Sequence, residues 1–309
     1  MIALTIRQME YFEALAETAH FGRAADLAGV SQPALSAQIG KMERQLGMKL
    51  FERGGRAVRL TSEGVALRER VELVLDQMRA IEKNAARGAR GMSGPFRLGI
   101  IPTVAPYLLP GLLAELRRRF PELQVEIREA TTPTLVDDVA ARRLDALIAA
   151  LPLERGGLVV EPLFADRFLL AVPTDDAGFI DPPVSPESPA LERLMLLEEG
   201  HCLRDQALAV CGKVQPRVMA SFSATSLTTL LQMVAHGMGV TLIPEMAAEA
   251  AAVTPNVRLV PFEEPAPDRT ICLAWRRNTS MQAECLEMAG TIRSFRAGVG
   301  RSSVDKVAM

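Results

Sequence analysis

The sequence predicts an α/β protein with a small helical unit at its N-terminus, one long helix, and a two-lobed α/β region after it. Up to about residue 90, apolar residues recur every three or four positions, which is typical of amphipathic helices. From residue 96 the pattern changes to alternating strand-like and helix-like segments, which favours a sheet covered by helices. The run 91–95, rich in glycine with serine and proline, separates the two patterns and predicts a hinge.

Composition excludes several classes of protein. A chain of 309 residues is long enough for two or three compact units. Its net charge of −2 argues against a uniformly basic coat, although residues 1–91 hold 14 basic against 11 acidic side chains and the remainder 21 against 26. There is no signal-peptide pattern and no apolar run of the roughly 18 residues that span a bilayer, so we expect no membrane partner. Four cysteines without an export signal predict free thiols in the cytoplasm.

The N-terminal part of the chain predicts three short helices and a small hairpin. Apolar stripes place the first helix at 5–19 and the second at 23–28. A third helix should begin after Ser31, an expected N-cap, and end at Gly47. Two helices joined by a tight glycine turn form the helix-turn-helix pattern.

The solvent side of that third helix carries the side chains expected to read DNA. Amides and hydroxyls near a helix N-terminus reach base edges in the major groove, and arginines on a hairpin grip phosphate. A helical bundle whose surface amides only aid solubility would show a similar pattern. The candidate DNA contacts are Gln32, Pro33, Ser36 and Lys41 on the helix, with Arg53, Arg56 and Arg59 on or near the hairpin.

A long helix is expected from Ser62 to about Arg90. Its apolar residues are spaced by three and four, which suits an antiparallel helix pair between two chains. A surface helix packed within one chain is the alternative. The residues of this seam are Val65, Val71, Val74, Leu75, Met78 and Ile81.

The remaining chain predicts two α/β lobes around a parallel sheet. Strands are expected at 96–101, 123–128, 146–150, 240–243 and 270–275, and helices at 106–120, 135–143, 226–236 and 281–296. Ligands of such folds bind between lobes, near strand C-termini and helix N-termini. Thr103 and Thr132 follow the first two strands, so both are expected to point into that cleft.

Two thiols lie nine positions apart at the ends of a helix-forming run, Leu203–Val210. At the N-terminus of this helix, free N–H groups and the helix dipole should stabilise a Cys202 thiolate, with added positive charge from His201 and Arg204. Cys211 would then lie about 13.5 Å along the axis. A disulfide needs Cα atoms within about 7 Å, so the thiols cannot bond unless the helix unwinds.

Other interpretations of the cysteines remain. Most free cysteines in an apolar chain are small buried hydrophobic residues. A metal site built from His201, Cys202 and Cys211 matches no usual zinc spacing, so we expect no metal and no cofactor. Cys272 and Cys285 lie in a strand-like and a helix-like run and are interpreted as core or surface thiols.

The order of helix, turn, helix, Phe51-Glu52-Arg53 and a basic hairpin resembles the winged helix-turn-helix of LysR-type transcriptional regulators, closely over residues 4–65. The two lobes resemble the periplasmic-binding-protein-like effector domain of that family. The resemblance implies a homo-oligomer, dimer or tetramer, that binds an interrupted palindrome in double-stranded DNA. Within the pattern, Ala37 stands where several relatives carry a basic residue.

The run Gly-His-Cys-Leu-Arg-Asp-Gln-Ala with a second cysteine nine positions on resembles the hydrogen-peroxide-sensing OxyR subfamily. Ile101-Pro102-Thr103-Val104, Ala224-Thr225-Ser226-Leu227 and Arg269-Thr270-Ile271 are similar to the same subfamily. The resemblance implies Cys202 as the peroxidatic and Cys211 as the resolving thiol. The peroxide pocket it implies is Thr103, Thr132, His201, Asp205 and Arg269. One departure is Gly212, where a bulkier apolar residue is expected.

We therefore expect a cytoplasmic, DNA-binding regulator of oxidative-stress genes, an activator and not an enzyme. Its expected partners are double-stranded DNA, hydrogen peroxide, RNA polymerase, reductants of the thioredoxin or glutaredoxin type, and further copies of itself in a tetramer, a dimer of dimers. One rival is a LysR-type regulator that binds a small organic anion, with the cysteines as bystanders. Another is a thiol peroxidase using the same pair, although the N-terminal 90 residues argue against an enzyme.

The expected domain boundaries follow from these patterns. The DNA-binding unit spans 1–61, the linker and dimerisation helix 62–90, the hinge 91–95 and the redox-sensing region 96–309, with lobe I at about 96–165 and 268–300 and lobe II at about 166–267.

Overall fold

The computed structural model describes residues 4–52, 58–87, 92–153, 156–175, 180, 182–212 and 224–307. The chain divides into two compact units, one formed mainly by Met1–Ala89 and the other by Arg90–Arg277 with Met281–Met309. The first unit has one hydrophobic core and the second has two. Along the described ranges, no helix is both long and apolar enough to cross a lipid bilayer.

Three helices form the centre of the first unit, as the sequence predicts. They are α1 (Ile6–Thr18), α2 (Phe21–Leu27) and α3 (Gln32–Leu46). Gly47 ends α3 in the left-handed region, at φ +69°, which glycine adopts without strain. Ser31 occupies the N-cap position of α3, but its side chain makes no capping hydrogen bond. That part of the expectation is wrong, and Pro133-like stabilisation by a proline in the first turn remains through Pro33.

A two-stranded hairpin and a long helix complete the first unit. β1 (Phe51–Glu52) pairs antiparallel with β2 (Arg59–Leu60), and α4 follows at Ser62–Arg87. The expected seam of α4 divides into two faces. Val71 and Leu75 are buried in the core of the unit. The other face leaves large apolar side chains exposed: Val65, Val74 and Ile81.

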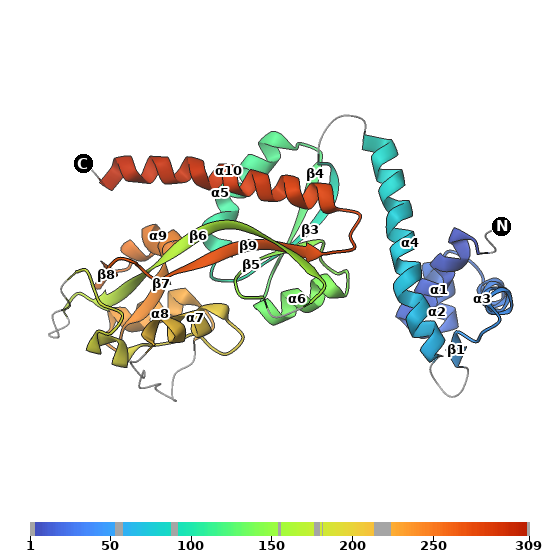
Figure 1. Ribbon diagram of the computed structural model, residues 1–309, viewed down its shortest axis with the longest axis horizontal. Helices are drawn as coiled ribbons and strands as arrows, with labels where there is room; N and C mark the ends of the chain where they lie inside the picture. The colour runs from blue at the N-terminus through green and yellow to red at the C-terminus, as the bar shows by residue number, and fades with distance from the viewer. Residues whose placement is uncertain are drawn as a thin grey trace. The chain divides into compact units, whose positions relative to one another are not determined.

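The second unit is built on a seven-stranded sheet, ordered β4-β3-β5-β9-β6-β7 with β8 also paired to β6 (Figure 1). Its strands are β3 (Gly94–Ile100), β4 (Leu123–Glu129), β5 (Ala146–Ala150), β6 (Leu158–Pro173), β7 (Thr241–Pro244), β8 (Val257–Pro261) and β9 (Asp268–Arg276). The expected parallel sheet is correct only for β3, β4 and β5. Every other pairing is antiparallel, because β6 carries the chain out of the first lobe and β9 brings it back.

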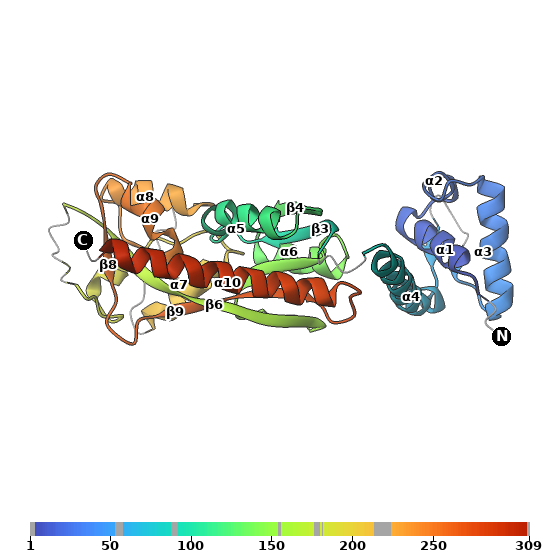
Figure 2. The ribbon, with the colours of Figure 1, turned by 90° about the horizontal axis from the view of Figure 1, so that it is seen from above.

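Helices cover this sheet in two lobes with separate cores. Lobe I contains β3, β4 and β5 with α5 (Ala105–Arg119), α6 (Thr132–Ala140) and the start of α10 (Gln282–Val307). Lobe II contains β7 and β8 with α7 (Cys202–Cys211), α8 (Leu227–Ala235), α9 (Ala248–Ala252) and the short helices η1 (Pro189–Arg193) and η2 (Glu245–Ala247). The helix α10 lies along β6 and β9 (Figure 2).

Two helices differ from their expected bounds. α6 begins three residues earlier than expected, because Pro133 stands in its first turn, and it ends before Arg142, whose φ is +60°. α10 continues eleven residues beyond the expected end, and nothing in the structure explains why its glycines do not stop it.

Candidate functional site

The helix α7 has a cysteine at each end. Cys202 is its first residue and Cys211 its last, so the expected helix between the thiols is confirmed. Both thiols are free. A continuous helix separates residues nine positions apart by about 13.5 Å along its axis, beyond the reach of a disulfide. Bonding the two sulfurs therefore requires α7 to open.

The two thiols also belong to different hydrophobic cores. Cys202 is partly buried and packs against the core of lobe I, although α7 itself is part of lobe II. Cys211 is 1 % exposed and lies within the core of lobe II. A disulfide between them therefore removes at least one thiol from its packing, a consequence that no local sequence pattern reveals.

The expectation of a stabilised Cys202 thiolate is wrong in its direction. Burial raises the pKa of the Cys202 thiol above its ordinary value, and this outweighs the charge of Arg269, the Thr132 hydroxyl and the backbone of Ala150 and Leu203, which lower it. The sequence gives no measure of this burial, because it arises from packing against lobe I.

The two positive charges expected beside Cys202 are not supplied. Burial lowers the pKa of His201, which keeps the imidazole neutral near pH 7, although Glu198 opposes this shift. The Arg204 guanidinium donates to the Leu197 carbonyl oxygen, with 2.9 Å between Nη1 and O. The cation that does lower the pKa of Cys202 is Arg269.

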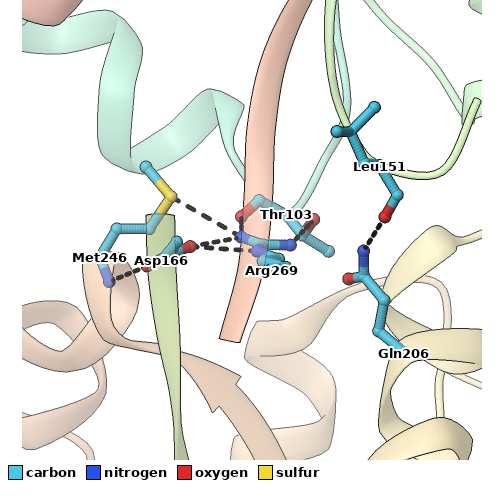
Figure 3. A network of polar contacts seen from close by, with 6 residues as sticks. All are labelled: Thr103, Leu151, Asp166, Gln206, Met246 and Arg269. Carbon is cyan, nitrogen blue, oxygen red and sulfur yellow. Dashed lines mark hydrogen bonds and ion pairs between the residues drawn. The ribbon is translucent and has the colours of Figure 1, made fainter. Parts of the chain in front are cut away.

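A buried ion pair holds Arg269 in place (Figure 3). Its Nε and Nη2 donate to Asp166 Oδ2 at 3.0 and 2.9 Å, and Asp166 Oδ1 accepts from the Met246 N–H at 3.0 Å. Arg269 Nη1 and Nη2 also donate to the hydroxyl and carbonyl oxygens of Thr103, at 2.9 and 3.1 Å. These contacts orient the guanidinium rigidly beside the thiol.

Sequence reasoning missed Asp166 and Met246. Asp166 is 2 % exposed and stands in the otherwise apolar run Phe164–Phe168 of β6, next to Arg167. A single carboxylate at an inward-facing strand position predicts a buried cation as its partner, and that signal was available.

One side chain of α7 reaches across to lobe I (Figure 3). Gln206 Nε2 donates to the carbonyl oxygen of Leu151, which follows β5, at 3.1 Å. Gln206 was not among the expected site residues, because a glutamine inside a helical run carries no signal of its partner. The bond ties the helical form of α7 to lobe I.

A cleft of about 640 Å³ opens beside Cys202. It lies between the start of α6, the segment after β5, and α7. Its lining residues are Thr132, Pro133, Val136, Asp137, Leu151, Pro152, Gly200, Cys202, Asp205, Gln206 and Ala209.

The cleft brings together some of the expected pocket residues and not others. Thr132, Cys202 and Asp205 line it. Thr103 is 2 % exposed and does not line the cleft, since its hydroxyl is bonded to Arg269. His201 is buried at the N-cap of α7 without a capping hydrogen bond from its side chain.

The remaining cysteines are structural in their surroundings. Cys272 in β9 and Cys285 in α10 are fully buried. Burial raises the pKa of Cys272 to about 12 and that of Cys285 further still. Among the residues whose placement is described, no group of three or more His, Cys, Asp or Glu side chains is arranged to hold a metal ion.

The candidate DNA contacts on α3 reach solvent. Gln32, Pro33 and Lys41 are exposed and Ser36 is half-buried. Arg59 is exposed on β2, whereas Arg53 and Arg56 lie outside the described residues.

A buried carboxylate that sequence reasoning missed joins α3 to the hairpin. Glu43 Oε1 accepts from the N–H groups of Leu50 and Phe51 at 3.0 and 3.4 Å, and Oε2 accepts from Lys49 Nζ at 3.2 Å. Burial by itself raises the pKa of Glu43, but these hydrogen bonds outweigh it and hold the pKa below its ordinary value. The ionised side chain fixes where the hairpin leaves α3.

Comparison with known proteins agrees with this geometry over nearly the whole chain. Residues 6–65 match the bacterial regulatory helix-turn-helix protein, lysR family, and residues 89–295 match the LysR substrate binding domain. A hydrogen peroxide-inducible genes activator of Pectobacterium carotovorum is 39 % identical over 295 residues, which cover 96 % of this chain and 98 % of the relative. The chain belongs to the OxyR group of the LysR family. Its members are transcriptional regulators, so it is not classed with enzymes.

Further relatives carry the same names. The DNA-binding transcriptional dual regulator OxyR of Escherichia coli K12 is 40 % identical over 291 residues, covering 94 % of this chain and 95 % of the relative. A full-length OxyR variant from Pseudomonas aeruginosa superposes with a TM-score of 0.74 at 34 % identity, covering 95 % of this chain and 96 % of that one. A hydrogen-peroxide-bound OxyR mutant from Corynebacterium glutamicum gives a TM-score of 0.66 at 32 % identity, covering 95 % and 93 %.

Proposed function

We propose that this OxyR-group regulator senses hydrogen peroxide through Cys202 and stores the signal as a Cys202–Cys211 disulfide. The observation that carries the proposal is α7 itself, a helix with a free thiol at each end and with those thiols packed in different cores. Relatives named hydrogen peroxide-inducible genes activators support the choice of oxidant.

The first step forms a sulfenic acid at Cys202. The thiolate sulfur attacks one peroxide oxygen, the S–O bond forms as the O–O bond breaks, and the second oxygen leaves as water after taking the thiol proton. Because burial raises the pKa of Cys202, only a small fraction is thiolate at pH 7. The fixed charge of Arg269 favours both the thiolate and the leaving hydroxide. We assign Thr103, Thr132, His201 and Asp205 to the surroundings of this reaction.

The second step joins the two thiols. The larger, polar sulfenic acid no longer fits against the apolar core of lobe I, and α7 opens. The Cys211 sulfur then attacks the Cys202 sulfur, a disulfide forms, and water leaves. Reductants of the thioredoxin or glutaredoxin type reset the pair by thiol–disulfide exchange.

Redox change at α7 reaches DNA through the other unit. We assign DNA reading to residues 1–61, with base contacts from Gln32, Pro33 and Ser36, and phosphate contacts from Lys41, Arg53, Arg56 and Arg59. Residues 62–90 form the dimer contact, which the exposed Val65, Val74 and Ile81 of α4 support. This is a proposal for a cytoplasmic tetramer on an interrupted palindrome that recruits RNA polymerase, with residues 91–95 as hinge and 96–309 as sensor.

The decisive experiment compares three proteins under brief peroxide exposure. We expect the wild-type protein to yield a Cys202–Cys211 peptide by mass spectrometry and a changed promoter footprint. Cys202→Ser should abolish both, and Cys272→Ser, a matched control at a buried cysteine, should change neither. A normal footprint response in Cys202→Ser would overturn the assignment.

The rival regulator, which binds a small organic anion, fits the cleft less well. Two of the lining residues, Asp137 and Asp205, are carboxylates, and no cationic residue is among the described lining residues. An anion would therefore be repelled at this cleft. Calorimetry with candidate carboxylates, which we expect to show no heat of binding, tests this rival directly.

A further inference from the structure

The cleft beside Cys202 is far larger than hydrogen peroxide requires. A water molecule takes roughly 30 Å³ in the liquid, so a molecule of two oxygens takes about twice that volume. The cleft measures about 640 Å³. Most of its volume must therefore hold solvent or a larger molecule.

The lining of this cleft is chemically one-sided. Its apolar members come from three separate segments: Pro133 and Val136 of α6, Leu151 and Pro152 after β5, and Ala209 of α7. Its charged members, Asp137 and Asp205, are both acidic. Such a surface favours an apolar, uncharged molecule over an anion.

Two oxygens beside Cys202 lack hydrogen-bond partners. Among the described residues, Thr132 Oγ1 and Gln206 Oε1 are buried and make no hydrogen bond of normal geometry, and both residues line the cleft. Buried polar atoms of this kind are rare in folded proteins, and a bound polar group explains them. A hydroperoxide supplies one, since its O–H donates and its oxygens accept.

We infer that the cleft admits an uncharged organic hydroperoxide, whose O–O group meets Cys202 and whose alkyl or aryl body covers the apolar lining. The inference rests on the proposed role of Cys202 as the peroxidatic thiol. It extends that role to a second class of oxidant.

The chemistry follows the same course with a different leaving group. The Cys202 sulfur attacks the terminal oxygen, the S–O bond forms and the O–O bond breaks. The alkoxide takes the thiol proton and leaves as an alcohol, so sulfur is oxidised by two electrons and the peroxide is reduced. No further reactant is required.

The test measures the rate of Cys202 oxidation in the full-length wild-type protein with cumene hydroperoxide and with hydrogen peroxide. We expect the rate to saturate with cumene hydroperoxide, because it binds before reacting, and to rise linearly with hydrogen peroxide. A cumene hydroperoxide reaction that stays linear and about a hundredfold slower would overturn the inference. Failure of both peroxides would instead overturn the proposed function.

A variant that fills the cleft supplies the second measurement. Ala209→Trp should lower the ratio of the cumene hydroperoxide rate constant to the hydrogen peroxide rate constant by about tenfold or more. Ala252→Trp, at an exposed alanine of α9 that does not line the cleft, is the matched control and should leave that ratio unchanged. An unchanged ratio in Ala209→Trp would contradict the inference.

Charge selectivity provides a third arm. The hydroperoxide of linoleic acid carries a carboxylate, which Asp137 and Asp205 repel, so we expect it to react more slowly than cumene hydroperoxide. A faster reaction with the fatty-acid hydroperoxide would show that the cleft does not select uncharged molecules.

Discussion

The two ends of α7 differ in every property that governs thiol chemistry. At one end, Cys202 is partly exposed, lines a cleft and is affected by the Arg269 charge and the Thr132 hydroxyl. At the other end, Cys211 is buried in the core of lobe II, and burial alone raises its pKa. The comparison teaches that the sequence of events is set by surroundings and not by the thiols themselves. Cys202 meets the oxidant, and Cys211 becomes available only after α7 opens.

The largest expected effect removes the cation that only the Cys202 end has. Arg269→Met leaves the Asp166 carboxylate buried without its partner, which costs about 3–5 kcal/mol of unfolding free energy. Thermal unfolding checks this, and the rate of Cys202 oxidation should fall as well.

Arg293→Met is the matched control for that prediction. Its ion pair with Glu161 is half exposed, and such pairs contribute about 0–1 kcal/mol. Equal losses of stability in the two variants would contradict the account of the buried pair.

Alkylation as a function of pH sharpens the comparison of the two thiols. Since the pKa of each thiol lies above its ordinary value, neutral pH is below both, and the thiolate fraction rises about tenfold per pH unit. We expect iodoacetamide to modify Cys202 about tenfold faster per unit between pH 6.5 and 8.5, and Cys211 more slowly at every pH. Mass spectrometry of the two peptides measures both rates. A plateau for Cys202 below pH 7 would restore the stabilised thiolate that the sequence alone predicts.

A smaller effect is expected when the tie between α7 and lobe I is removed. Gln206→Leu loses the hydrogen bond to Leu151, worth about 1 kcal/mol, and this destabilises only the helical, reduced form. The reduction potential of the Cys202–Cys211 pair should become more negative by about 20 mV. A redox titration measures it, with Gln232→Leu, at an exposed position of α8, as the control that should show no shift.

The smallest expected effect lies at the Cys211 end. Gly212 follows Cys211 with φ +45°, so Gly212→Ala introduces backbone strain of about 1 kcal/mol or less into the reduced form. No atom within 4 Å obstructs an added Cβ. The same titration should show a shift in the same direction as Gln206→Leu and no larger. A larger shift would place the dominant restraint on α7 at its C-terminal end.

Local patterns in the sequence predicted much of the fold. Helices such as α1 and α3, the strand β5, and the helix between the two cysteines follow from apolar spacing and from glycine at helix ends. The direction of β9 and the sixteen-residue length of β6 did not follow, because strand pairing depends on residues far apart in the chain.

The site was predictable in its reacting residues but not in its electrostatics. The spacing of Cys202 and Cys211 is written in the sequence, whereas the sign of the Cys202 pKa shift depends on packing against lobe I. The partners of Arg269 come from Asp166, 103 positions away, and from Thr103, 166 positions away. No local pattern could assign them.

The anchoring of Cys202 in lobe I and of Cys211 in lobe II gives α7 a mechanical role. In the thiol state the helix acts as a strut that fixes the distance between the two lobes. Oxidation removes this strut, so its immediate product is added freedom of one lobe against the other. The amplitude of interlobe motion, which hydrogen exchange in β6 and β9 can follow, would then rise on oxidation.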